Sequence, residues 1–362
     1  MTTASIPSPK RRSNSDFVPA ILLGGPAFLL LLVFLIGPFF AGVSYSFTNQ
    51  RLISGNTTDF VGLRNYTRLL KLSYLMLEPQ KDEKTGALLR DDAGTLTYQR
   101  SRDFTRDEVK YPQYTGLREW FYIPWGEKRL VILAGDPVFM KSLGNNIFFA
   151  VIVIPLQSII GLMLALLVNQ KLAGRNFFRT IYFSPVVTSM VVVSIVWKFL
   201  YDLNHGMINQ FLANFSIAPV NWLGDPNIAM LSIIIMSVWQ GAGFQMILFL
   251  AGLQGIPEQL YEAASIDGAN IWEKFRYITV PSLRNTTLFI FITITIAAFQ
   301  LFTQVFVMTN GGPDDSTSTV AFHMIRTGFR EQDLAYASTI SVVFFLIILA
   351  INWVQRRVTR DV

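Results

Sequence analysis

Six long apolar runs divide the chain. The last five are each close to the roughly 20 residues that an α-helix needs to cross the hydrocarbon core of a bilayer, and the first is longer. We therefore predict transmembrane helices at 17–48, 142–169, 180–202, 226–254, 285–309 and 335–355. The first run follows a basic, Ser/Pro-rich tail (residues 1–16), and it is about twice as long as the apolar part of a signal peptide, so we expect it to be retained. Pro26 and Pro38 are the expected kink points within it.

The composition supports a membrane protein rather than a soluble one. Of the 362 residues, 51% are hydrophobic and only 15% are charged, whereas about 25% is usual for a soluble domain. The apolar residues are also gathered into uninterrupted runs. These features predict an all-α polytopic membrane protein with six transmembrane helices.

Basic residues beside the runs predict the orientation in the membrane. Three lie in each of four segments that alternate with the spans, twelve in all: Lys10, Arg11, Arg12; Lys171, Arg175, Arg179; Lys274, Arg276, Arg284; Arg356, Arg357, Arg360. The opposite short loops, about 203–227 and 309–334, hold only Arg326 and Arg330. Because cytoplasmic loops carry the excess of Lys and Arg, both termini are predicted to be cytoplasmic. This placement also explains the net charge of +6, so binding to nucleic acid is not needed to account for it.

Residues for catalysis or metal binding are scarce. The chain has no Cys, and its two His, His205 and His323, are far apart with no ligand spacing around them, so no metal site is expected. Met140 stands where a phosphate-binding loop before Lys141-Ser142 would need its second glycine. We expect no covalent chemistry and no cofactor bound by this chain.

A short polar segment between the fourth and fifth runs carries the strongest signal. It contains Glu262-Ala263-Ala264-Ser265-Ile266-Asp267-Gly268-Ala269. The paired alanines allow another protein to approach closely, and Gly268 can adopt the left-handed conformation that ends a helix. Asn270 followed by Glu273 predicts a capping box for a second helix, which Pro281 is expected to stop. Trp272, Phe275 and Thr279 are expected on one face of this second helix, beneath the bundle.

This segment resembles the signature loop of the inner-membrane permease subunits of binding-protein-dependent ABC importers. The residues that match the family's motif are Glu262, Ala263, Ala264, Asp267, Gly268, Ala269 and Pro281. The resemblance implies a permease core over 142–354. It also implies that the cytoplasmic loop 255–284 contains a coupling helix docked on a separate ATPase.

The same resemblance implies the partners of the chain and its location in the cell. It would pair with a second related permease, two ATPase subunits that hold ATP and Mg, and an extracytoplasmic solute-binding protein. Its location would be the bacterial inner membrane.

Polar residues inside the apolar runs mark a candidate substrate path. They are Thr188 and Ser189 beside Pro185; Ser237, Trp239, Gln240, Gly241 and Gln245; and Gln300, Phe302 and Gln304. Polar groups at membrane depth need partners, water or substrate. Amides beside aromatic rings suit a neutral polyhydroxylated ligand, and hydrogen bonding between helices is the alternative.

The fifth span resembles that of sugar-type permeases, because Gln300 and Phe302 precede a Gly-Gly-Pro exit. Ala298 and Leu301 stand where the maltose-type site has amides. The resemblance therefore implies a sugar-like ligand and argues against maltose. The alternative within the same machine is glycerol-3-phosphate or another polyol derivative.

The long loop 49–141 is predicted to be extracytoplasmic. Its ends resemble the short loop of sugar-type permeases, so about 71–135 is an insert. Alternating apolar residues at 95–98 and 129–133 predict short strands in it. A solvated elaboration and a small domain that touches the binding protein both remain open.

Two other classes of protein fit the sequence less well. An ion-coupled secondary transporter usually carries charged residues inside its bundle, and the central parts of the six runs have none. A membrane-embedded enzyme would need clustered His, Asp or Glu at membrane depth, and the runs have no such cluster. A non-catalytic permease is the prediction that remains.

Overall fold

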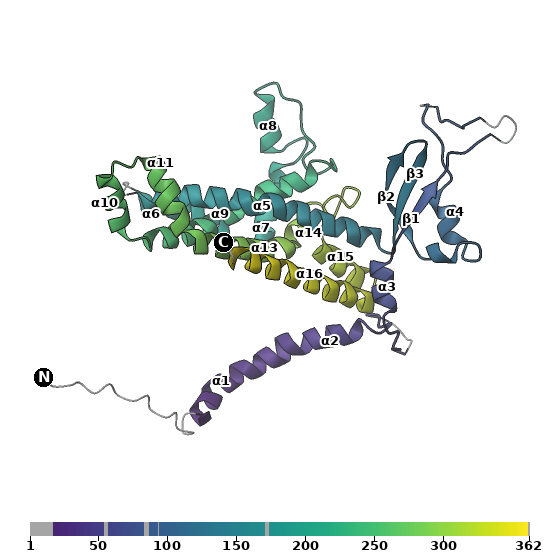
Figure 1. The fold of residues 1–362 in the computed structure, drawn as a ribbon, viewed down its shortest axis with the longest axis horizontal. Coiled ribbons are helices and arrows are strands. Elements are labelled where there is room, and N and C mark those ends of the chain that lie inside the picture. The colour runs from purple at the N-terminus through teal and green to yellow at the C-terminus, as the bar shows by residue number, and fades with distance from the viewer. Residues whose placement is uncertain (1–16, 54–56, 83–86, 93, 171–173, 361–362) are drawn as a thin grey trace.

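The computed structural model describes residues 17–53, 57–82, 87–92, 94–170 and 174–360. This part of the chain is mostly helical. It forms an elongated bundle with a small sheet at one end and a helical hairpin at the other (Figure 1). The predicted cytosolic tail, residues 1–16, lies outside the described residues.

Within the described ranges, four helices are long and apolar enough to cross a membrane. They are Ile21–Tyr45, Pro137–Asn169 (α5), Ala229–Gln254 (α9) and Leu334–Arg357 within α16 (Leu334–Arg360). Two bent pairs bring the number to six if each pair is one span: Arg175–Val187 (α6) with Met190–Leu200 (α7), and Ile271–Ser282 with Arg284–Phe299 (α13). The helical, apolar class is confirmed, and the count of six stays a prediction.

The first apolar helix is interrupted by a π-helical turn. α1 (Phe17–Leu31) and α2 (Gly37–Tyr45) flank η2 (Leu32–Ile36). The turn ends two residues before Pro38, whose ring crowds the carbonyl four residues earlier, and a wider turn accommodates that ring. α2 packs on α16 through Phe39 and Phe345, and α1 diverges from the bundle (Figure 1).

The third predicted span is not a continuous helix. α6 and α7 are bent by 97° at Thr188 and Ser189, whose backbones are extended. Pro185 lies one turn before this break and removes a backbone hydrogen bond from the last turn of α6. Hydropathy does not detect such a break, since the residues on both sides of it are apolar.

The fifth predicted span also ends early. α13 stops at Phe299, and α14 (Thr303–Met308) begins only after a non-helical stretch. Two side chains bind carbonyl groups at this interruption. The Asn146 Nδ2 donates to Ala298 O (3.2 Å) and the Thr319 Oγ1 to Leu301 O (2.6 Å). They replace hydrogen bonds that a continuous helix would have made.

α5 and α9 form the central helix pair and approach closely at glycines. A Cβ atom at Gly161 would lie 2.6 Å from Cβ of Gln245, and one at Gly241 would lie 1.6 Å from Nε2 of Gln157. Gln157 uses this space to donate to Ser237 O (3.2 Å). Small residues of this kind are what allow two helix backbones to pack tightly in a bilayer.

The predicted insert is a small β-sheet unit, so the all-α description needs correction. β1 (Leu72–Leu77), β3 (Lys128–Ala134) and β2 (Arg118–Trp125) form an antiparallel sheet in that spatial order. Its core consists of Leu75, Leu77, Leu117, Val131 and Leu133. The strand expected at 129–133 is confirmed, whereas the stretch at 95–98 forms only isolated bridges.

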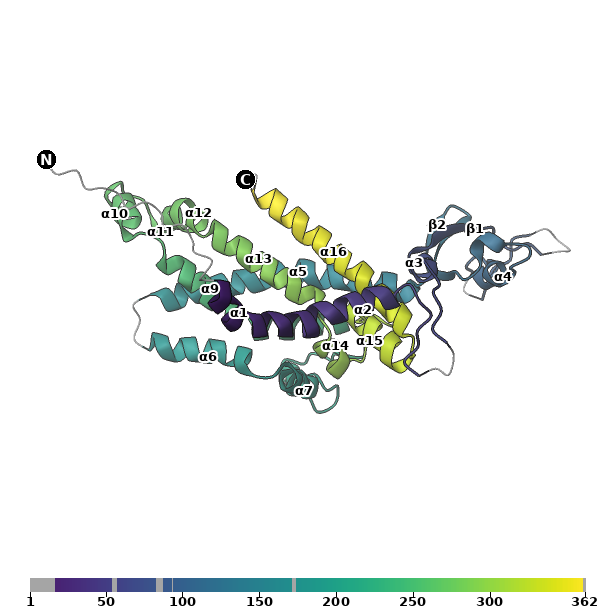
Figure 2. The same cartoon turned by 90° about the horizontal axis from the view of Figure 1, so that it is seen from below.

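The remaining short elements connect these parts. They are α3 (Arg64–Leu70), α4 (Ser101–Arg106), η3 (Pro112–Tyr114), α8 (Met207–Ala213), α15 (Val320–Ile325) and the π-helical turn η5 (Arg326–Arg330). Figure 2, seen from below, shows α6 and α7 on the side of the bundle away from α16.

The insert leaves and rejoins the bundle at one point. The Gly135 N–H donates to Lys71 O (2.9 Å), next to the start of β1. A Cβ atom at Gly135 would lie 1.9 Å from Arg68 O, so only glycine permits this approach of the two chain segments.

Asp136 then anchors the start of α5 to two distant elements. Its carboxylate accepts from the Phe139 N–H (2.9 Å) and the Tyr336 hydroxyl (2.8 Å), and it lies 2.9 Å from Nε2 of His323. Burial alone would raise the pKa of Asp136. The hydrogen bond and charge of His323, aided by the Phe139 N–H and the Tyr336 hydroxyl, outweigh this effect and lower the pKa to about 2.

Replacing Asp136 by Asn should reduce stability in a pH-dependent way. Because folding lowers the pKa from 3.8 to about 2, the ionised carboxylate stabilises the fold above pH 4. This contribution is lost as the pH falls through the folded pKa. The shift corresponds to about 2 kcal/mol. Denaturant titration in detergent should show that Asp136→Asn has a lower free energy of unfolding than the native protein at pH 7. The difference between the two proteins should narrow between pH 4 and pH 2. Asp92→Asn, at an exposed site, is the control, and a pH-independent difference would contradict the assignment.

Gly241→Ala should lower the thermal stability of the chain, because the added methyl group must displace the Gln157 amide. Overpacking of this kind typically costs about 1–3 kcal/mol. Adding Gln157→Ala removes the obstructing amide and should restore most of the loss. Gly144→Ala is the matched control, since nothing lies within 4 Å of a Cβ atom there. A double variant no more stable than Gly241→Ala would refute this packing.

Candidate functional site

The signature loop forms a compact helical hairpin at the end of the bundle opposite the sheet (Figure 1). α10 (Glu258–Ile266) is followed by α11 (Ile271–Lys274), the π-helical turn η4 (Phe275–Thr279) and α12 (Val280–Ser282). The predicted turn between the two arms is present, since Gly268 has a φ of +79°. The second arm ends close to Pro281, as expected. α12 continues directly from η4 and stops at Ser282, after which the chain bends by 63° into α13.

Side chains hold the two arms of the hairpin together. The predicted capping box is confirmed: the Glu273 N–H donates to Asn270 Oδ1 (2.9 Å), and Glu273 Oε2 accepts from the Asn270 N–H (2.7 Å). Lys274 Nζ donates to Ser265 Oγ (2.7 Å) across the turn. Nearer the bundle, the Tyr261 hydroxyl lies 2.9 Å from Oγ1 of the buried Thr279. The hairpin is therefore a fixed shape and not a loose loop.

Much of the hairpin surface is uncovered, although it includes large apolar side chains. α10 contains no buried residue. Ile266 and Ile271, on either side of the turn, are 87% and 88% exposed, and Trp272 is also exposed, which corrects its expected position beneath the bundle. An exposed apolar patch on a rigid element is typical of a docking surface for another protein.

The motif residues lie around this patch. Exposed positions are Glu262, Ala263, Asp267, Gly268 and Pro281, while Ala264 and Ala269 are half-buried. The Ala269 N–H donates to Ala264 O (2.8 Å), so these two alanines close the turn from inside. The outward members offer a small-residue surface bordered by the carboxylates of Glu262 and Asp267.

The candidate path residues of α9 divide into two groups. Ser237 and Gln245 are buried, and Oγ of the first and Oε1 of the second have no hydrogen-bond partner among the described residues. Trp239 and Gln240 point outward toward the broken third span. Trp239 contacts the Trp197 ring at 5.6 Å, and Gln240 Nε2 donates to a backbone carbonyl of α6 at 3.4 Å. Gln157 of α5 also belongs here. No local motif marks it in the sequence, because its contact with α9 depends on how the two helices pack.

The other candidates lie where helices are interrupted. Thr188 and Ser189 form the exposed break between α6 and α7. Gln300 is exposed at the end of α13, and Phe302 stacks on Phe306 at 5.4 Å. Gln304 is half-buried on α14, which packs against α7. In the described part of the chain no hydrogen bond joins Gln300 or Gln304 to α9, so the structure brings together only part of the predicted set.

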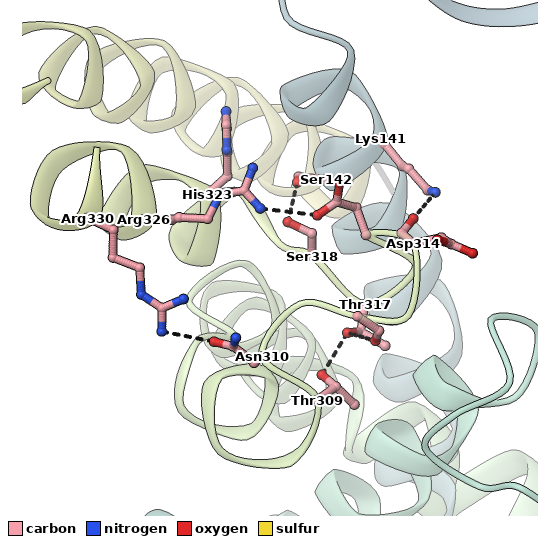
Figure 3. A network of polar contacts seen from close by, with 12 residues as sticks. Lys141, Ser142, Thr309, Asn310, Asp314, Thr317, Ser318, His323, Arg326 and Arg330 are labelled. Carbon is pink, nitrogen blue, oxygen red and sulfur yellow. Dashed lines mark hydrogen bonds and ion pairs between the residues drawn. The ribbon is translucent and has the colours of Figure 1, made fainter. Parts of the chain in front are cut away.

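The loop that follows the Gly-Gly-Pro exit is tied to the N-terminal part of α5. Figure 3 shows this polar network, in which Ser142 Oγ lies 2.9 Å from Ser318 Oγ and Lys141 contacts the Asp314 carbonyl. The Arg330 guanidinium donates to Asn310 Oδ1 (3.0 Å) in the same network. In the described ranges, no group of three or more His, Cys, Asp or Glu has the arrangement of a metal site.

The sequence matches a family model and several known proteins. Residues 157–362 match the family described as the binding-protein-dependent transport system inner membrane component. The chain is 33% identical over 296 residues to the trehalose/maltose transport system permease protein MalF of Thermococcus litoralis, covering 81% of this chain and 95% of the relative. It is 38% identical over 242 residues to the lactose transport system permease protein LacF of Rhizobium radiobacter, covering 65% and 81%.

Solved structures show the same fold. A chain of a bacterial ABC transporter that imports the acidic polysaccharide alginate superposes with a TM-score of 0.69 at 18% identity, covering 96% of this chain and 98% of the other. A chain of the alginate transporter in complex with its pentasaccharide-bound periplasmic protein gives 0.56 at 23% identity, covering 62% and 80%. The family match spans more than half of the sequence and includes the helical hairpin, so the chain belongs to the family of inner membrane components of binding-protein-dependent transport systems.

Proposed function

We propose that this chain is the permease subunit of an ATP-driven importer that moves a sugar-like solute inward by alternating access. The observation that carries the proposal is the rigid hairpin of α10 and α11. It presents the family motif beside exposed Ile266 and Ile271. In this proposal the patch docks on a separate ATPase, whose movements rock the bundle.

The distribution of charge supports an external source of energy. A proton- or ion-coupled transporter carries ionisable side chains within its spans. The central parts of the apolar runs in this chain have none. The ATPase would therefore hold ATP and Mg, and this chain would transmit the resulting movement through residues 255–284.

The charge count also supports an orientation. With both termini and the hairpin in the cytoplasm, the sheet of β1–β3 stands outside, at the opposite end of the bundle (Figure 1). A solute-binding protein would approach that outer end. This direction fits the twelve basic residues on the proposed cytoplasmic side and the two on the opposite short loops.

Two kinds of observation support a sugar-like solute. The two relatives named above transport trehalose, maltose or lactose according to their names. In this chain, buried Ser237 and Gln245 have polar atoms without partners, and the exposed Gln300 precedes the aromatic Phe302. In this proposal, a second, related permease faces these residues and completes the substrate path. Glycerol-3-phosphate or another polyol derivative is the alternative cargo.

Ala263→Trp tests the proposed coupling. Ala263 is exposed, so an indole at this position should leave folding of the chain unchanged. The same indole cannot fit into a closely packed interface. In a reconstituted complex with the ATPase and the binding protein, solute-stimulated ATP hydrolysis should fall by roughly tenfold, about 1.4 kcal/mol of lost docking energy.

Val109→Trp is the matched control, because Val109 is 96% exposed on the insert. The reconstituted complex that carries Val109→Trp should hydrolyse ATP at the rate of the native complex. Unchanged activity of Ala263→Trp would refute the coupling role. Uptake that persists with an inactive ATPase and stops when the ion gradient collapses would favour a secondary transporter.

Removing side chains of the candidate path should weaken transport. Ser237→Ala, Gln240→Ala and Gln300→Ala should each raise KM by about 2- to 10-fold, the range expected for one lost hydrogen bond. Ser158→Ala is the matched control, since this hydroxyl already donates to Ile154 O at 2.7 Å within its own helix. Uptake by all three variants equal to that of the native protein would contradict the path.

A further inference from the structure

A cavity of about 980 Å³ lies between the insert and the outer end of the helix bundle. Its insert wall is formed by α4 and the start of β2. Its bundle wall is formed by the start of α5, the region of α15 and η5, and Tyr336 of α16. The volume is within the range of roughly 300–1,000 Å³ that is usual for small-molecule sites. The candidate path described above does not include any of these residues.

The insert wall is strongly basic. Arg102, Arg106 and Arg118 line the cavity, and none of the three makes an ion pair with a residue in the described ranges. The single acidic side chain on this wall is Glu119, whose carboxylate already accepts a hydrogen bond from Ser101 Oγ at 2.6 Å. Three guanidinium groups and one carboxylate therefore line this wall, which leaves an excess of two positive charges.

The charges of the bundle wall, by contrast, are already neutralised. Arg68 pairs with Asp333 at 3.3 Å. Arg326, which Figure 3 shows on the same element as Arg330, pairs with Asp315 at 3.2 Å and with Glu331 at 3.4 Å. The excess positive charge of the cavity therefore comes from the insert.

The bundle wall also contributes two buried polar atoms that lack a partner. Nδ1 of His323 and Oγ1 of Thr327 make no hydrogen bond within the described part of the chain, although the two side chains are only 4% and 1% exposed. Buried polar atoms are nearly always hydrogen-bonded, and leaving one without a partner costs free energy. Both residues line the cavity, and a rotation of the Thr327 side chain toward it would give its hydroxyl a partner on a bound ligand.

We propose that this cavity binds a small oxyanion, a carboxylate or a phosphate, carried on a hydroxyl-bearing body. Guanidinium groups bind such oxygens in a bidentate manner, and here Arg102, Arg106 and Arg118 provide three of them. Thr327 Oγ1, turned toward the cavity, bonds a hydroxyl group of the ligand deeper in it. A soluble sugar acid and the headgroup of phosphatidylglycerol share this chemistry. A ligand held between both walls links the insert to the bundle.

The test uses the full chain in detergent and two matched pairs of probes. Galacturonate is compared with galactose, and dioleoylphosphatidylglycerol is compared with dioleoylphosphatidylcholine. Binding to the folded chain raises the midpoint of thermal unfolding in a concentration-dependent manner, from which an affinity follows. At least one anionic probe should stabilise the chain more than its neutral or zwitterionic counterpart. A response to galacturonate alone assigns a soluble sugar acid, and a response to the anionic lipid alone assigns a headgroup.

Variants locate the binding in this cavity. Replacing Arg102, Arg106 and Arg118 together by Gln should weaken the affinity at least about tenfold. Thr327→Val should weaken it about threefold, whereas Thr327→Ser should retain it. Arg90→Gln, on the insert but outside the cavity, should leave it unchanged. Equal stabilisation by the charged and uncharged probes, or native affinity in the triple variant, would overturn the proposal.

Discussion

The close contact between α5 and α9 is the constraint on which the rest of the molecule depends. In a bilayer, lipid tails are as apolar as the helices, so helices associate through tight packing and a few polar contacts. Gly161 and Gly241 provide that packing, and Gln157 adds a hydrogen bond to Ser237 O. α5 begins at the insert, and α9 ends just before the helical hairpin. One helix pair thus connects the two ends of the protein.

Hydropathy predicts the apolar helices well because burial in lipid requires an uninterrupted apolar surface. It cannot detect the breaks at Thr188 and at Gln300, since these depend on distant groups that take over the freed backbone hydrogen bonds. Asn146 and Thr319 do so for the second break, and Asn146 lies 152 residues from the carbonyl it binds. The contact of Asp136 with His323 and Tyr336 spans almost 200 residues, so no local pattern announces it.

The helical hairpin was the most predictable part of the candidate site. Its turn and capping box depend on neighbouring residues such as Gly268, Asn270 and Glu273, whose preferences are local. The candidate path was less predictable. Whether an amide such as Gln240 faces another helix or open space depends on packing, and in this chain its nearest partner is the carbonyl of Pro185. The exposure of Gln300 and Trp239 likewise follows from where the helices end.

The meeting of Lys71 and Gly135 has a consequence for the entropy of the chain. Their hydrogen bond fixes the two ends of the insert side by side, and pairing of β1 with β3 continues directly from it. The insert is therefore closed as a loop at its two ends. Lengthening a flexible loop costs little, about 0.6 kcal/mol for each doubling. The far end of the insert can therefore gain or lose residues without disturbing the first turn of α5. Variation in the length of the insert should hardly change the stability of the bundle.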